Sequence, residues 1–292
     1  IPINQEIRRI IESGNGTRMT LPEIIAEEIR DFYASPQFTI MEEAEQYYRN
    51  RSSVQGKTTK YKDRSNTKIE HPILRKLVDQ KANYLLSKPF SVESENPAYA
   101  KSLSELFDSR FRQQVKSLGK GAVKSGIAWL APYFEDSRLK WMRLPSTEVV
   151  PIWHDYEHTQ LDAYIRVYSQ VVYHGKEKKT IARVEWWDRE GVKKYKALWP
   201  IVGTPVLEPD YDSDPATNEF PHFTVNGQPY NWDAVPIVWC RYNEEELPLQ
   251  YFIKDLIDDV NWQTSITADV LRDIAKFIFV LKNYGGQDIG QF

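Results

Sequence analysis

The sequence contains a single cysteine, five histidines and no apolar stretch long enough to cross a bilayer. The lone Cys240 cannot form an internal disulfide, which fits a reducing cytoplasm. The first residues lack the charged head and apolar core of a signal peptide. We therefore expect no membrane partner.

The sequence also lacks a large excess of charge of one sign, since the formal net charge of the 292 residues is only −3. A dedicated DNA-binding protein usually has a strongly basic surface, so that class is disfavoured for the chain as a whole. Hydrophobic residues make up 41% of the sequence, enough for a chain of this length to bury a core without disulfides or metals.

The motifs of common enzymes are absent too. No phosphate-binding loop, dinucleotide fingerprint or Gly-x-Ser-x-Gly elbow occurs. His154 and His158 have a spacing that could bind zinc on a helix, but Pro151 and the surrounding strand pattern favour a solvated turn. We predict no catalytic residue, no metal site and no cofactor. A carbohydrate-active enzyme that uses carboxylates with Trp186, Trp187 and Trp199 stays open as a rival, although neighbours on a strand point to opposite faces.

Helical periodicity dominates the first 125 residues. The apolar spacing predicts helices around residues 24–32, 41–50, 72–86 and 97–124, the last with an interruption near Gly119-Lys120-Gly121. In the third helix, Ile73, Leu77 and Tyr84 with the pair Leu74 and Val78 are predicted to form one apolar stripe.

The pattern changes to strands over residues 126–242. Alternating and aromatic runs predict strands at 127–134, 139–143, 163–168, 181–187 and 192–199, followed by a Pro-, Asn- and Gly-rich excursion. Helical spacing returns at Pro248, with the apolar stripe Leu249, Phe252, Ile253, Leu256, Ile257 and Val260. A further helix is predicted from about Thr267 to Asn283. This order of helices, a β-rich block and long helices predicts an α+β fold.

The segment 49–68 is the most basic part of the sequence. It carries seven lysines and arginines against one acid, and we interpret it as a mobile loop. Its candidate phosphate contacts are Arg49, Arg51, Lys57, Lys60, Lys62 and Arg64. A stand-alone DNA-binding module that uses this loop is therefore the alternative function.

Five blocks of sequence, in order, resemble the portal proteins of long-tailed phages of Gram-positive bacteria. They lie within residues 47–49, 65–89, 126–129, 144–152 and 235–286, and include Tyr84-Leu85-Leu86-Ser87-Lys88-Pro89 and Asn243-Glu244-Glu245-Glu246. Each block is weak alone, and their shared order over nearly the whole chain carries the resemblance.

This resemblance implies a structural subunit of a ring of about twelve copies at one capsid vertex, and no enzyme. Double-stranded DNA would pass through the ring during packaging and ejection, terminase and later head-tail connector proteins would dock on it, and it would be assembled in the host cytoplasm into the virion. Residues 1–247 would form the wing (helical to 125, β-rich from 126 to 242), 248–266 the first stem helix, and 267–292 the start of a truncated clip.

Four charged residues on the predicted stem helix lie off its apolar stripe. Lys254, Asp255, Asp258 and Asp259 are the candidate DNA-channel face. An acidic wall would repel phosphates and keep DNA from binding to the channel.

Overall fold

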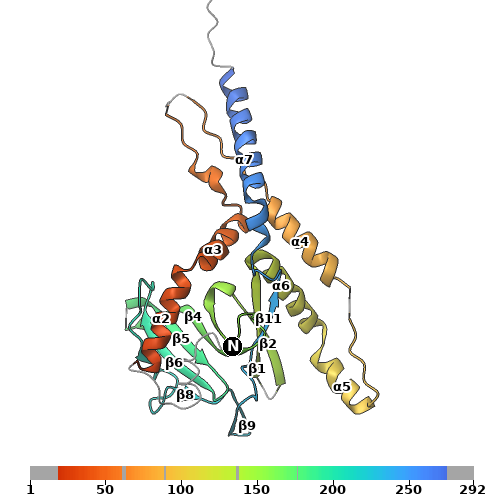
Figure 1. Cartoon of the computed structure of the whole chain (residues 1–292), viewed down its shortest axis with the longest axis vertical. Coiled ribbons are helices and arrows are strands. Elements are labelled where there is room, and N and C mark those ends of the chain that lie inside the picture. The colour runs from red at the N-terminus through yellow and green to blue at the C-terminus, as the bar shows by residue number, and fades with distance from the viewer. Residues whose placement is uncertain (1–18, 61–63, 89, 136–137, 176, 275–292) are drawn as a thin grey trace, which may run out of the picture.

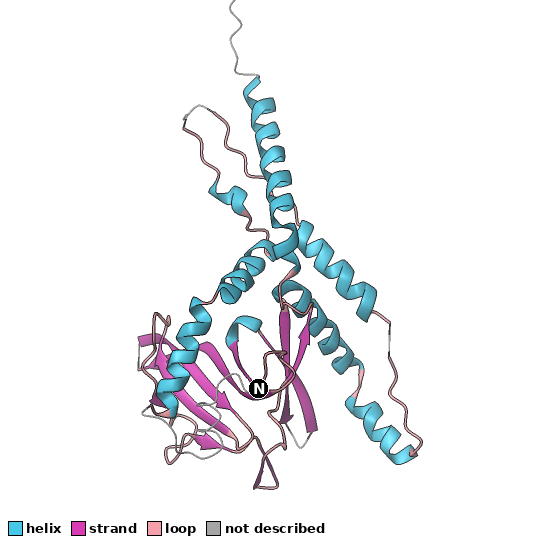
Figure 2. Cartoon of the chain, in the orientation of Figure 1, coloured by secondary structure: helices cyan, strands magenta, loops and turns pink. Residues whose placement is uncertain are grey.

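The computed structural model describes residues 19–60, 64–88, 90–135, 138–175 and 177–274. Helices come first, strands occupy the middle, and a long helix, α7, follows them and projects away from the body (Figures 1 and 2). The predicted α+β class is confirmed. No helix in these ranges is long and apolar enough to span a membrane.

Two capped helices open the described chain. Helix α2 (Leu21–Ala34) begins at Thr20, whose hydroxyl and backbone N–H both donate to the Glu23 carboxylate. Helix α3 (Pro36–Tyr48) begins at Ser35, whose Oγ accepts from the Phe38 N–H at 3.1 Å. This cap starts α3 five residues before the predicted position.

Helix α4 (Ile73–Leu86) matches the prediction in extent but not in its packed face. Leu74, Val78 and Ala82 are buried, whereas Tyr84 is 85% and Leu85 70% exposed. The predicted place of Tyr84 in the apolar stripe was therefore wrong, because the packed face of α4 is the i, i+4 row Leu74, Val78 and Ala82, and Tyr84 lies off that row.

The predicted helix 97–124 is two helices, α5 (Pro97–Leu106) and α6 (Ser109–Ser125). The break falls where Asp108 caps α6 by accepting from the Phe111 N–H at 2.8 Å. The predicted interruption near Gly119 is wrong, since α6 continues through it. A Cβ on Gly119 would lie 2.3 Å from Leu86 Cδ1, so glycine there allows α4 to approach closely.

The strands form two main antiparallel sheets. The smaller has the order β11-β1-β2, from β1 (Ile127–Glu135), β2 (Arg138–Leu144) and β11 (Val238–Arg241). The larger has the order β3-β4-β5-β6-β7, from β3 (Val149–Trp153), β4 (Leu161–His174), β5 (Glu177–Trp187), β6 (Val192–Leu198) and β7 (Glu208–Pro209), and β8 (Glu219–Phe220) also pairs with β6. A hairpin of β9 (Phe223–Val225) and β10 (Gln228–Tyr230) completes the predicted β-rich block.

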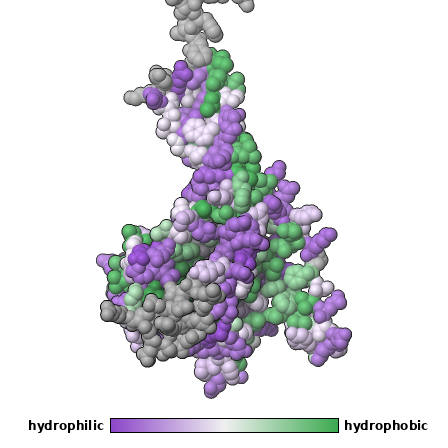
Figure 3. All heavy atoms as spheres, in the orientation of Figure 1, coloured by the Kyte–Doolittle hydropathy of each residue, from purple (hydrophilic) through white to green (hydrophobic). Residues whose placement is uncertain are grey.

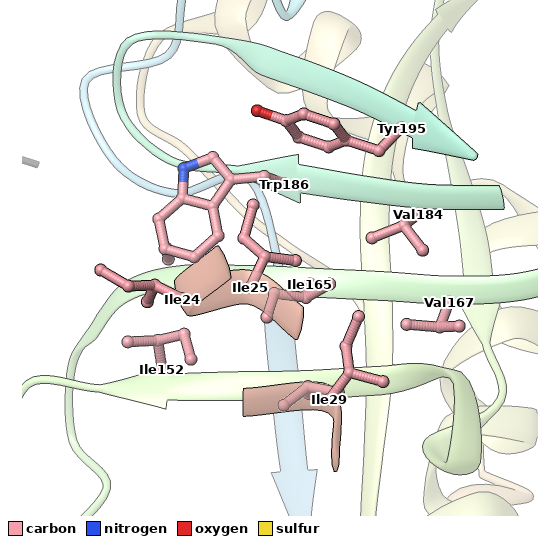
Figure 4. Packing of buried hydrophobic residues seen from close by; sticks show 11 residues of the cluster. Ile24, Ile25, Ile29, Ile152, Ile165, Val167, Val184, Trp186 and Tyr195 are labelled. Carbon is pink, nitrogen blue, oxygen red and sulfur yellow. The ribbon is translucent and has the colours of Figure 1, made fainter. Parts of the chain in front are cut away.

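Helix α2 covers one face of the larger sheet. Its Ile25 and Ile29 are fully buried against strand residues that include Trp186 (Figure 4). Trp187 lies on the other face, where its ring stacks on Tyr164 with centroids 5.6 Å apart. The predicted opposite orientation of Trp186 and Trp187 is confirmed, so the two rings do not line one cleft.

Helix α7 (Leu249–Ile274) is a single helix of 26 residues, about 39 Å long. A new helix at Thr267 was predicted, but α7 passes through this position without a break. Residues 261–266 contain neither Pro nor Gly, and Asn261, Trp262 and Ser265 in this stretch have hydrogen-bond partners outside the helix. The predicted apolar stripe is split: Leu249 and Ile257 are buried, whereas Phe252 is 58% and Leu256 66% exposed.

Gly126 fixes the junction between α6, β1 and the segment before α7. Its φ is +86°, and a Cβ would lie 1.8 Å from the Glu246 carbonyl oxygen. Gly227 in the β9–β10 turn has a similar φ of +78° with open space around it. Both glycines therefore need a left-handed backbone, but only Gly126 has another backbone segment packed against it.

We expect Gly227→Ala to lower the free energy of unfolding by about 1 kcal/mol, the cost of a left-handed backbone. Gly126→Ala adds overpacking against backbone and should cost about 3 kcal/mol in total. Urea denaturation of both variants measures the difference. Equal losses would show that the approach to Glu246 does not constrain this junction.

Candidate functional site

An extended segment, residues 64–71, lies along α7 and is called the strap. Every second backbone N–H of the strap donates to a side chain of α7, and the acceptors are four residues apart. The donors Ser65, Thr67, Ile69 and His71 pair with Asp273, Asp269, Ser265 and Asn261, at 3.1, 2.7, 2.9 and 3.0 Å respectively.

The spacing of this ladder follows from two repeat lengths. Two residues of extended chain rise about 6.6 Å. Four residues of α-helix rise about 6.0 Å. An extended segment running antiparallel to a helix can therefore keep its alternate N–H groups in register with an i, i+4 row of acceptors. All four acceptor residues are buried, so the strap satisfies polar groups on both sides.

The Lys57–Asp269 ion pair lies at the middle of the ladder. The Lys57 side chain is 9% and that of Asp269 13% exposed, and Lys57 Nζ also donates to the Thr67 carbonyl at 3.2 Å. Burial of the Asp269 carboxylate acts to raise its pKa, but hydrogen bonds from Lys57 and Thr67 outweigh burial, and the pKa lies below its usual value.

The short 3-10 helix η1 (Ser53–Gly56) and the residue before it, Ser52, also contact α7. Asn261 Nδ2 donates to Ser52 Oγ at 3.0 Å, and Trp262 Nε1 donates to Ser53 Oγ at 3.1 Å. Both ends of the basic segment are thus anchored on α7, and its interpretation as a mobile loop was wrong for residues 51–57 and 64–68.

The predicted phosphate contacts that the structure describes lie in different environments. Arg49 pairs with Glu45 at 2.7 Å within its own turn of helix, and Lys57 is buried in the ion pair with Asp269. The Arg49 side chain is nevertheless 61% exposed, whereas Lys57 is buried, and the role of these residues as phosphate contacts stays a prediction. Arg51, Lys60 and Arg64 are exposed, and Lys62 lies outside the described residues.

The four residues of the predicted channel face are divided between two environments. Lys254 pairs with Glu43 of α3, and Asp258 accepts a hydrogen bond from the Tyr47 hydroxyl at 2.7 Å. The hydrogen bond to Glu43 raises the pKa of Lys254 despite partial burial. Asp255 and Asp259 are exposed. The structure brings only these last two together on an open face.

Sequence reasoning missed the α7 acceptor row, Asn261, Ser265, Asp269 and Asp273. The signal was present as four short polar side chains at i, i+4 spacing on a helix predicted to pack by apolar residues. Short polar residues inside a helix are neutral or unfavourable unless their side chains have partners. Their repetition at one spacing therefore indicated a polar partner along that face.

The histidine pair lies in a turn, as predicted. His154 contacts Asp162 at 3.1 Å, whereas His158 contacts Glu246 at 2.7 Å and stacks on Trp153. The two histidines therefore have separate carboxylate partners. Across the described ranges, no group of three or more His, Cys, Asp or Glu side chains is placed to hold a metal ion.

The chain is similar in sequence to known proteins over the elements described above. The family model described as phage portal protein, SPP1 Gp6-like, matches residues 36–292, which include the strap and α7. The chain belongs to this family. It is 28% identical over 257 residues to the portal protein of Bacillus phage SPP1, covering 84% of this chain and 49% of the relative.

A second relative is the portal protein of Clostridium phage phiCD119. It is 25% identical over 273 residues, which cover 86% of this chain and 56% of the relative. The chain thus spans about half the length of the curated portal proteins it matches. The resemblance to phage portal proteins drawn from the ordered sequence blocks is confirmed.

Removing the carboxylate of Asp269 should leave the buried Lys57 charge without a counter-charge and the Thr67 N–H without its acceptor. We expect Asp269→Ala to lower the free energy of unfolding by about 3 kcal/mol, the lower end of the cost of breaking a buried pair. Asp255→Ala, an exposed acid on the same helix, should stay within about 0.5 kcal/mol. Chemical denaturation gives both values, and amide hydrogen exchange at Thr67 and Ile69 should accelerate only in Asp269→Ala. Unchanged exchange would exclude the ladder as the holding interaction.

The lowered pKa of Asp269 also predicts an acid dependence. Its contribution is present above the unfolded-state carboxyl pKa of about 3.9 and is lost as the pH falls through the lower folded-state value. The stability difference between the native protein and Asp269→Asn should therefore be constant above about pH 5 and shrink below about pH 4. Asp259→Asn serves as the control, and its stability should differ little from that of the native protein at every pH. A difference that grows on acidification would contradict the assignment.

Proposed function

We propose that this chain is the N-terminal part of a subunit of the phage portal ring through which double-stranded DNA is packaged and ejected. Residues up to 247 form the wing, and the stem helix begins at 248. Because α7 is unbroken to Ile274, we extend the proposed stem beyond residue 266, and the clip would start later.

The observation that carries this proposal is the extent of the family match. It runs from the start of α3 to residue 292, so it includes both sheets, the strap and α7. The order of elements, with a β-rich body before a projecting helix, is compatible with a ring whose subunits contribute one stem helix each.

The strap gives α7 the lateral support that such a role needs. A helix about 39 Å long that projects from a body has few contacts of its own to fix its direction. The ladder adds four hydrogen bonds and one ion pair along its outer half. A stem held in this way would keep its position beside moving DNA.

The remaining parts of the proposal follow from the family. Terminase would dock during packaging, capsid proteins would surround the ring, and head-tail connector proteins would replace terminase, so that the subunit becomes part of the virion. Of the four residues predicted for an acidic channel wall, Lys254 and Asp258 contact α3, which leaves Asp255 and Asp259 exposed. Reversal of the charges of these two acids, described below, distinguishes a channel face from a contact between copies.

No observation favours the stand-alone DNA-binding module. Two of its six candidate phosphate contacts, Arg49 and Lys57, are neutralised by carboxylates of the same chain. Residual binding through Arg51 and Lys60 would show a shallow salt dependence, because few phosphates would be neutralised.

Negative-stain electron microscopy of the product of the complete gene, with mass from light scattering, tests the proposal. We expect rings with an axial hole and a mass of about twelve subunits, as the family resemblance implies. The 292-residue chain is imaged in parallel as the matched sample. A complete product that stays monomeric at high concentration would overturn the portal assignment.

A further inference from the structure

Helix α7 has an exposed apolar ridge opposite the face that it packs on the body. The α7 ridge consists of Phe252 and Leu256, one turn apart, with exposed fractions of 58% and 66%. Asp255 and Asp259, also exposed and also one turn apart, form the neighbouring row. The ridge is therefore apolar with an acidic margin.

A groove of complementary character lies between α4, α6 and β11. The α4 groove has a volume of about 680 Å³, and its lining includes Leu77, Lys81, Tyr84, Leu85 and Arg241. Tyr84 and Leu85 are among the most exposed large hydrophobic residues of the described chain. Hydrophobic surface gathers over α7 and over the α4–α6 region in Figure 3.

The charges beside these two surfaces have opposite signs. Lys81 and Arg241 are exposed at the groove, and Arg241 donates to the carbonyl of Glu157 at 3.0 Å rather than to a carboxylate. Within the described ranges, neither they nor Asp255 and Asp259 form an ion pair. The groove is thus apolar with a basic rim, and both surfaces lie open in the single chain.

We propose that the α7 ridge of one copy seats in the α4 groove of a second copy. Phe252 and Leu256 would bury against Leu77 and Leu85, while Asp255 and Asp259 face Lys81 and Arg241. The occupant is a second copy because this chain itself presents both the acidic ridge and the basic groove. This inference rests on the proposed portal function, and it names the surfaces by which neighbouring subunits meet.

The contact is heterologous, since it joins two different surfaces. Each copy that uses its ridge keeps its groove free, so the contact repeats in one direction and closes into a ring when the rotation permits. The pairing of opposite charges sets the partner and its orientation. A twofold dimer of ridge against ridge would instead place the acidic margins of two copies close together.

Trans-complementation of two broken variants tests this arrangement. Leu256→Glu disables the ridge and Leu85→Glu disables the groove of the 292-residue chain. We expect each variant alone to lose self-association at least about tenfold in analytical ultracentrifugation, as for other anchor positions. Mixed in equal amounts, they should form a dimer that does not extend, because one intact ridge meets one intact groove. Val171→Glu, an exposed apolar position on β4, is the matched control and should associate like the native chain.

The outcomes separate the possible arrangements. If Leu256→Glu lost self-association and Leu85→Glu did not, a ridge-to-ridge contact would replace the proposed one. Failure of the mixture to form a dimer, with both variants folded by circular dichroism, would overturn it. Native chain that stays monomeric at millimolar concentration would also count against it.

Charge reversal gives a second readout in the complete gene product. Asp255→Lys with Asp259→Lys should abolish rings, and adding Lys81→Glu with Arg241→Glu should restore them. Rings that persist in the acid-reversed variant, with raised affinity for DNA, would assign these acids to the channel and overturn the contact. That result would leave the portal function intact, whereas absence of rings from the native product would overturn the portal function itself.

Discussion

The direction of α7 depends on the agreement between two backbone repeats. Extended chain advances about 6.6 Å in two residues and a helix about 6.0 Å in four, so the strap and α7 stay in register over four hydrogen bonds. Over a much longer contact the difference of about 0.6 Å per step would accumulate and break the register. The strap has three steps between its four hydrogen bonds, and the acceptor side chains absorb the accumulated difference, since the four donor–acceptor distances stay between 2.7 and 3.1 Å.

The acceptor row contains two carboxylates, Asp269 and Asp273, and two neutral side chains, Asn261 and Ser265. Asn261 donates to Ser52 Oγ, and Ser265 Oγ accepts from the Ile69 N–H while it donates to the Asn261 carbonyl. Asp269 faces Lys57, which compensates its charge in a buried position. Removing either partner would leave an uncompensated charge, so this pair fixes which residue of the strap meets which turn of α7.

The helices and strands that follow from local periodicity were predictable from the sequence. The surface on which each of them packs was not. The strands, α4 and the opposite orientations of Trp186 and Trp187 follow from periodicity alone. The break at Asp108 was misplaced because two glycines looked like a stronger signal than one capping aspartate. Their small size serves packing, since a Cβ on Gly119 would meet the end of the Leu86 side chain and force it to move.

For the site, the sequence pointed to the right segments with the wrong roles. The basic segment and α7 were both singled out, but counting lysines could not show that Lys57 lies against Asp269, 212 residues away along the chain. Nor could the apolar spacing of α7 show which of its residues face the body. Leu249, Ile253 and Ile257 do so, whereas Phe252 and Leu256 belong to the other side of the helix.

The two sides of α7 therefore have different partners for a physical reason. Its outer half is attached to the chain through polar side chains, so attachment does not consume the apolar residues of that helix. A helix held only by burial of its apolar stripe would hide that stripe in its own subunit. In the outer half, where the ladder holds α7, Ile266, Val270 and Leu271 stay exposed. In the inner half, Leu249 and Ile257 pack on the body, and Phe252 and Leu256 lie on the other side of the helix. The exposure of Phe252 and Leu256 costs stability that an intersubunit contact would recover.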